Sequence, residues 1–125
     1  NGRTYDHLRE LLPERAIYVF ERHVAAHPAC IPPPERLFVG DLRETLAAAR
    51  KDLGGSAALA HMDIGTGEAE ASRKLAASLV PALIALLRAG AVVASEPPLE
   101  APGLVALELP DGVAPGRYHL YRFSG

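Results

Sequence analysis

What this sequence lacks limits the kinds of protein it can be. Its 125 residues include one cysteine, Cys30, and no tryptophan. A single cysteine excludes an internal disulfide framework and is typical of proteins kept in a reducing cytoplasm. Lys and Arg together number 13 against 15 Asp and Glu. Without an excess of positive charge, nucleic acid is not an expected partner.

A hydrophobic run long enough to span a bilayer is also lacking. The apolar stretch from Leu75 to Leu87 is interrupted by Ser78 and Pro81 and is shorter than the roughly 20 residues that a spanning helix needs. We therefore expect a core helix there and no membrane segment. Apolar residues make up 49% of the chain, which suffices for the core of one domain of this length.

The segment from Asn1 to Glu21 combines a glycine, a helical pattern, an apolar stretch and an acid. Leucines recur at helical spacing between Thr4, a candidate cap, and Pro13, which ends the pattern. Residues Ala16 to Phe20 are apolar on both faces, as in an interior strand of a parallel sheet. The segment predicts a glycine turn, a helix and a strand that ends at a carboxylate.

Gly2 and Glu21 have the spacing found in nucleotide-binding doubly wound sheets. There, a glycine turn lets the backbone approach the ligand, and an acid about 20 residues later binds the ribose hydroxyls. No apolar strand precedes Gly2 in this chain. We therefore expect the sequence to start after the first strand of such a sheet, truncated at its N-terminal side.

The remainder alternates strands with helices. Strands are predicted over residues 36–39, 57–62 and 91–95, helices over 42–53 and 68–88, and a stiff extended linker over 31–34. Segments 104–109 and 117–123 have strand composition on either side of a Pro-Asp-Gly turn and predict an antiparallel pair. This order predicts one α/β domain over residues 1–125, with a Rossmann-like, doubly wound, mostly parallel sheet and a C-terminal antiparallel hairpin.

Acids follow three of the predicted strands: Glu21, Asp41 and Asp63. Ligands of open α/β sheets bind beyond the carboxyl ends of the strands, which makes these side chains candidate site residues. Each has a structural alternative. Glu21 would be an exposed capping acid, Asp41 would cap the helix that begins at Leu42, and Asp63 would shape the turn before Gly65.

The order of elements, and the run Asn-Gly-Arg-Thr-Tyr-Asp-His-Leu-Arg at residues 1–9, resemble the class I S-adenosylmethionine-dependent methyltransferases, in particular a small bacterial branch. The resemblance implies S-adenosyl-L-methionine as cofactor and methyl transfer to a small-molecule acceptor. The residues it assigns to cofactor binding are Gly2, Arg3, Glu21, Asp41 and Leu42.

The same resemblance places Asp63 near the methionine part of the cofactor or the acceptor. A carboxylate there could take a proton or orient a nucleophile. The Asn/Asp-Pro-Pro-aromatic motif of methylases that act on nucleobase amino groups is absent at this point, so such acceptors are not expected. The run Asp63-Ile64-Gly65-Thr66-Gly67 itself resembles a glycine motif. However, Glu70 stands in place of the third glycine, and too little chain follows for the other strands.

Histidines offer weaker candidates. His23, His27 and Cys30 have a spacing compatible with metal ligation, but no fourth ligand is visible and we expect no metal site. His61 lies inside an apolar strand and is predicted to be a core histidine. His119, in the terminal strand pair, is a candidate for the border of an acceptor pocket.

Two other function classes stay open at this point. One is a catalytically degenerate methyltransferase fold that acts as a binding or assembly subunit. The other is a nicotinamide-dependent reductase, which also needs a glycine turn and a ribose-binding acid. Self-association into a homo-oligomer is compatible with the sequence but not indicated by it.

Overall fold

The computed structural model describes residues 3–21, 32–64, 68–112 and 116–125. The chain divides into two compact units, residues 1–46 and 47–125, and each is described by itself. Helix α2 (Leu42–Leu53) contains the boundary between them.

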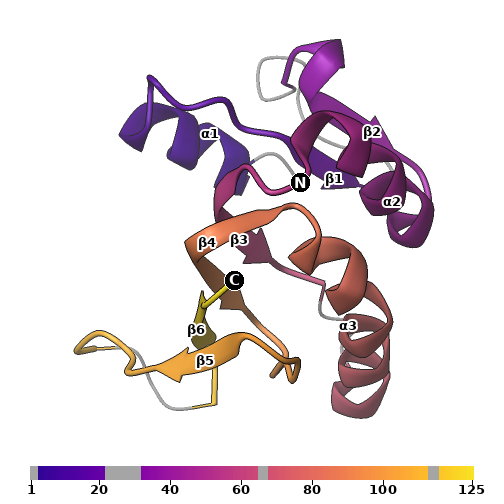
Figure 1. Ribbon diagram of the computed structural model, residues 1–125. Coiled ribbons are helices and arrows are strands. Elements are labelled where there is room, and N and C mark those ends of the chain that lie inside the picture. The colour runs from indigo at the N-terminus through magenta and orange to yellow at the C-terminus, as the bar shows by residue number, and fades with distance from the viewer. Residues whose placement is uncertain (1–2, 22–31, 65–67, 113–115) are drawn as a thin grey trace. The chain divides into compact units, whose positions relative to one another are not determined.

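The first unit carries a short parallel sheet (Figure 1). Its elements are α1 (Arg3–Leu11), β1 (Val19–Glu21), the 3-10 helix η2 (Pro34–Arg36) and β2 (Leu37–Val39). β1 and β2 pair in parallel, with Phe20 beside Phe38. The two rings stack with centroids 4.7 Å apart and planes 11° apart. The apolar stretch before Glu21 therefore does form a parallel strand, although a short one.

Three predictions in this unit were wrong in detail. Helix α1 already begins at Arg3, so that Thr4 lies inside the helix instead of capping it. β1 begins at Val19 and not at residue 16, because its length is set by the three residues that pair with β2. The extended linker ends at Pro33, and Pro34 opens η2, since the fixed φ of proline suits the first turn of a helix.

Helix α2 has the predicted bounds. Asp41 precedes it, and the chain leaves it through Gly54 and Gly55, the latter with a φ of +69°. Glycine adopts this left-handed conformation without strain and commonly ends helices. Asp41 before the helix and the glycine pair after it are local sequence signals, and both predicted the ends of α2 correctly.

The second unit holds a four-stranded sheet with the strand order β3-β4-β6-β5. Its elements are β3 (Ala57–Met62), α3 (Ala69–Ile84), β4 (Leu87–Ser95), β5 (Leu104–Leu107) and β6 (His119–Phe123). β3 and β4 are parallel, and β6 pairs antiparallel with both β4 and β5. The two C-terminal segments thus pair in the orientation that their composition predicted.

The core of this unit combines one helix face with the inner face of the sheet. α3 buries Ala76, Leu79, Val80 and Leu83, and the sheet buries Met62, Ala91, Val93, Tyr121 and Phe123. The hydroxyl of Tyr121 accepts a hydrogen bond from the Leu99 amide at 2.8 Å. This bond ties the segment after β4 to the sheet.

The boundary between α3 and β4 differs from the prediction. A helix was expected over residues 68–88 and a strand over 91–95, but α3 ends at Ile84 and β4 starts at Leu87. The Leu86 amide bonds the carbonyl of Leu83 in a tight turn, which buries Leu86 and Leu87. Pro81 lies within α3 and does not end it.

At the level of class, the molecule is a mixed α/β protein, as predicted. Within the part of the chain that the structure describes, no helix is both long and apolar enough to cross a membrane.

Candidate functional site

The carboxyl ends of β1 and β2 bring two predicted site residues to one edge of the first sheet. Glu21 is the last residue of β1, is half-buried and pairs with Val39. The Gly40 amide then donates to the Glu21 carbonyl at 2.9 Å, and Gly40 has a φ of +141°. Gly40 is thus held beside Glu21, and Asp41 follows it directly in the chain.

Asp41 caps helix α2. Its Oδ1 accepts from the Arg43 amide at 2.9 Å, and its carbonyl accepts from the amides of Glu44 and Thr45. The Arg43 side chain lies 3.5 Å from the same carboxylate oxygen, with both side chains largely exposed. The capping alternative considered for Asp41 is therefore observed. Leu42, half-buried, is the first residue of the helix.

Several other predicted site residues lie at the edge of the described part of the chain or outside it. Arg3 is the first residue of α1, and Gly2 lies outside the described residues. The candidate metal ligands His23, His27 and Cys30 also lie outside them. Among the residues that are described, no cluster of three or more His, Cys, Asp or Glu side chains is placed to hold a metal ion.

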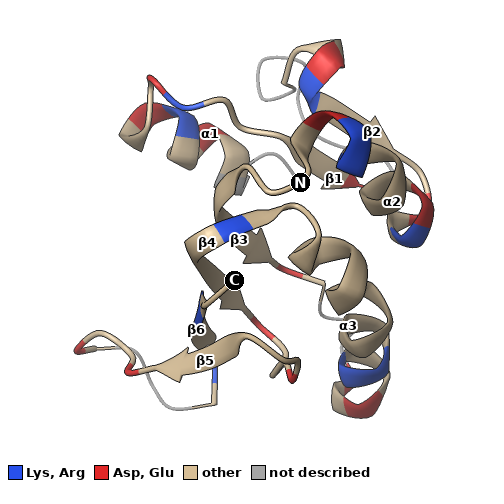
Figure 2. Ribbon diagram, viewed as in Figure 1, with Lys and Arg blue, Asp and Glu red and all other residues tan. Residues whose placement is uncertain are grey.

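In the second unit, the carboxyl ends of β3 and β4 bring two acids together. Met62 pairs with Ser95, and the Glu96 amide donates to the Met62 carbonyl at 3.1 Å. Asp63 and Glu96, the next residue on each strand, therefore leave the sheet side by side, and Figure 2 shows acidic segments after both β3 and β4. A hydrogen bond to Asp63 is the main cause that raises the pKa of Glu96, with burial and the charge of Asp63 adding to it.

Aromatic side chains border this acidic pair. Burial raises the pKa of Tyr118, and the nearby charges of Asp63 and Glu96 raise it further. The rings of Tyr118 and His61 lie 6.0 Å apart at 35°. His119 places Nδ1 3.2 Å from the Glu96 carbonyl oxygen. The strand ends thus gather two carboxyl groups, a phenol and two imidazoles.

The prediction for His61 was wrong, because its side chain is exposed and not in the core. The apolar composition around it concealed which face of β3 it occupies. Two members of the cluster, Glu96 and Tyr118, were not among the predicted site residues. The signal for Glu96 was available, since it follows the end of its strand just as Asp63 does.

Carboxylates placed just beyond parallel strands are typical of α/β proteins that bind nucleotides. This places the chain in a broad class of cofactor-binding α/β proteins. A family model described as S-adenosyl-L-methionine methyltransferase matches residues 1–123. The chain belongs to this family.

A solved structure agrees with the family. The crystal structure of an S-adenosyl-L-methionine methyl transferase from Silicibacter pomeroyi DSS-3, at 1.80 Å resolution, is 41% identical in sequence, with a TM-score of 0.93. The similarity covers 99% of this chain and 76% of that one. Among curated proteins, none matches the chain. The protein is thus an S-adenosyl-L-methionine-dependent methyltransferase, as the resemblance at residues 1–9 indicated.

Proposed function

We propose that this enzyme methylates a small molecule in the cytoplasm, at a nitrogen or oxygen that loses a proton in the reaction. The observation that carries this proposal is the pair formed by Asp63 and Glu96 at adjacent strand ends. A carboxylate beside the reacting atom can accept a proton, and the negative charge of this pair repels polyanions such as nucleic acids. The fold in this proposal is a Rossmann-like doubly wound sheet, supported by the parallel pairs β1-β2 and β3-β4.

Cofactor binding is proposed for Gly2, Arg3, Glu21, Asp41 and Leu42. Glu21 and Asp41 fit a nucleoside in their chemistry, because carboxylate oxygens accept from the donors that it offers, two ribose hydroxyls and an adenine amino group. Their placement after paired parallel strands, with a glycine between them, supports this assignment. When bound, S-adenosyl-L-methionine supplies a methyl group activated by a sulfonium.

Asp63 is proposed as the catalytic residue, and Glu96 as its partner. The Asp63 carboxylate would accept the proton that the acceptor nitrogen or oxygen gives up when it is methylated. The close approach of two carboxyl groups favours a state in which they share one proton. Glu96, whose pKa is raised chiefly by its hydrogen bond with Asp63, lies beside that carboxylate.

Calorimetric titration of the full chain with S-adenosylhomocysteine tests the cofactor site. Glu21→Ala removes acceptors for two hydroxyl groups, and the loss of charge-assisted hydrogen bonds predicts an affinity lower by about tenfold or more. Glu10→Ala is a matched control, because Glu10 is an exposed acid on α1. NADH, titrated in parallel, is expected not to bind.

Two outcomes would contradict the assignment. Equal affinity of the Glu21→Ala and unsubstituted chains would exclude Glu21 from the cofactor site. Absence of S-adenosylhomocysteine binding by a chain that is shown to be folded would argue against this cofactor site as a whole.

A further inference from the structure

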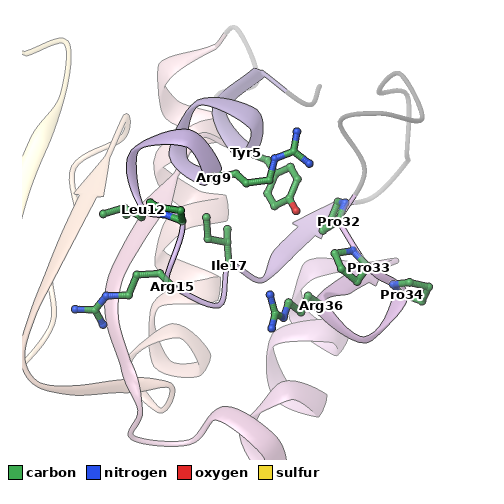
Figure 3. A pocket seen from close by; sticks show the side chains of 10 residues that line it. Tyr5, Arg9, Leu12, Arg15, Ile17, Pro32, Pro33, Pro34 and Arg36 are labelled. Atoms are coloured by element: carbon green, nitrogen blue, oxygen red, sulfur yellow. The ribbon is translucent and has the colours of Figure 1, made fainter.

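A pocket of about 590 Å³ lies in the first unit, at the ends of the strands opposite to Glu21 and Asp41 (Figure 3). Ile17, two residues before β1, and Arg36, directly before β2, both line it. Because β1 and β2 are parallel, these positions mark the amino ends of both strands. The carboxyl ends are where the cofactor residues are proposed, so the pocket belongs to a different edge of the sheet.

The charged side chains among the described residues that line this pocket are all of one sign. Arg9, Arg15 and Arg36 line it, and none of the described lining residues is acidic. Arg36 is half-buried, and within the described part of the chain its guanidinium has no ion-pair or hydrogen-bond partner. In Figure 3 the Arg36 side chain points toward Ile17, whereas the guanidinium of Arg15 points away. A half-buried guanidinium without a counter-charge favours an incoming anion.

Arg9 differs from Arg36 because it is already held in place. It forms an ion pair with Asp6 on the same helix, and its guanidinium lies 5.3 Å from the centroid of the Tyr5 ring. Tyr5 and Arg9 therefore form one prearranged wall, as Figure 3 shows. Asp6 pairs with Arg9 but does not line the pocket, so Arg36 is the better candidate to hold an anion there.

The remaining walls are apolar and stiff. Leu12 and Ile17 contribute aliphatic surface, and Pro13 and the proline run 32–34 complete the lining. Proline has a fixed φ, and so this lining loses little conformational entropy when a ligand binds. The volume is within the range of small-molecule sites. An apolar, rigid lining with the Arg36 guanidinium facing it suits a ligand that joins an anionic group to an apolar body.

We propose that this pocket is a second ligand site, distinct from the cofactor site, for a small organic anion that carries a phosphate or carboxylate group on an aromatic or aliphatic body. Arg36 is its principal anchor, through hydrogen bonds to two oxygens of the anionic group. Tyr5 and Ile17 contact the apolar body.

The test is a nuclear magnetic resonance titration of the full chain with phenyl phosphate, with benzoate and with uncharged benzyl alcohol. Ile17 is the reporter, and Ile64 and Ile84, in the second unit, are internal controls. Either anion should shift the Ile17 methyl signal saturably and leave the two controls unmoved. The stronger of the two binders then identifies the preferred anionic group. Benzyl alcohol should cause no saturable shift.

Arg36→Gln should lower the affinity for the more tightly bound anion by about tenfold or more, since a charge-assisted pair is lost. Arg73→Gln, which removes an exposed arginine of α3, should leave its affinity unchanged. Thermal unfolding of both variants checks that each is folded. No saturable Ile17 shift with either anion, or equal weakening by the two variants, would overturn the proposal. Because no methyl transfer is measured, this result is independent of the proposed reaction.

Discussion

Asp41 allows a structural role and a binding role to be separated by two substitutions. Its Oδ1 caps α2 through the Arg43 amide at 2.9 Å, and loss of such a cap costs about 1 kcal/mol of unfolding free energy. The ion pair with Arg43 is exposed, with 64% and 49% of the two side chains accessible, and contributes at most about 0.5 kcal/mol. Asp41→Ala should therefore destabilise the chain by about 1 to 1.5 kcal/mol.

Asp41→Ser keeps a good capping oxygen but removes the longer carboxylate. Its unfolding free energy in urea should fall by no more than about 0.5 kcal/mol. If Asp41 also accepts from the adenine amino group, both variants should lose S-adenosylhomocysteine affinity by a similar factor of about ten. Calorimetric titration measures that factor. If Asp41→Ser instead binds S-adenosylhomocysteine as tightly as the unsubstituted chain, the binding role is refuted. Asp41 would then serve only as the cap of α2.

Other predictions concern the second unit. The pKa of Glu96 is higher in the folded chain than in the unfolded one, so its stabilising effect is complete below the unfolded pKa and is lost as pH rises through the folded pKa. Carbon NMR titration should show this pKa fall toward its ordinary value in Asp63→Asn, and an unchanged value would exclude the shared hydrogen bond. Gly103→Ala should destabilise more than Gly55→Ala in urea unfolding. Both have positive φ, but a methyl group at Gly103 would lie 3.0 Å from Phe123 Cε1, whereas nothing lies within 4 Å of one at Gly55. Gly55→Ala should lower the unfolding free energy by about 1 kcal/mol, because of backbone strain alone. Gly103→Ala should lower it by about 1 to 3 kcal/mol more, because the added methyl group also meets Phe123. Equal losses would argue against the packing on Phe123.

The elements that could be predicted were those with local signals. Helix α2 lies between Asp41 and the Gly54-Gly55 pair, and β3 is followed by Asp63, so the bounds of both elements had signals in neighbouring residues. The start of β4 could not be found in this way. Leucines through residue 87 continue a helical spacing, yet β4 contains both Leu87 and Gly90, and Leu87 pairs with Ala57 of β3. Long-range pairing overrides local preference here.

The contrast between local signals and long-range pairing also applies to the candidate site residues. The place of Asp63 after a strand was predicted correctly, because a carboxylate after an apolar stretch is visible in the sequence, and the same holds for Glu21 and Asp41. The partnership with Glu96 follows from the register Met62 with Ser95, which no local pattern contains. The pocket lined by Arg36 and Ile17 was missed for the same reason, since its lining comes from α1, the loop before β1 and the residues that lead into β2.

Electrostatics restrict which acceptors the proposed reaction can serve. At neutral pH, two adjacent carboxyl groups carry at least one negative charge, which disfavours a carboxylate or phosphate acceptor at the same edge. An ammonium group would be attracted there, and it must lose a proton before its nitrogen can attack. Tyr118, whose pKa is raised by burial and by these charges, stays protonated and can donate a hydrogen bond to the acceptor. An amine or a neutral hydroxyl compound is therefore the acceptor class that this acidic edge fits best.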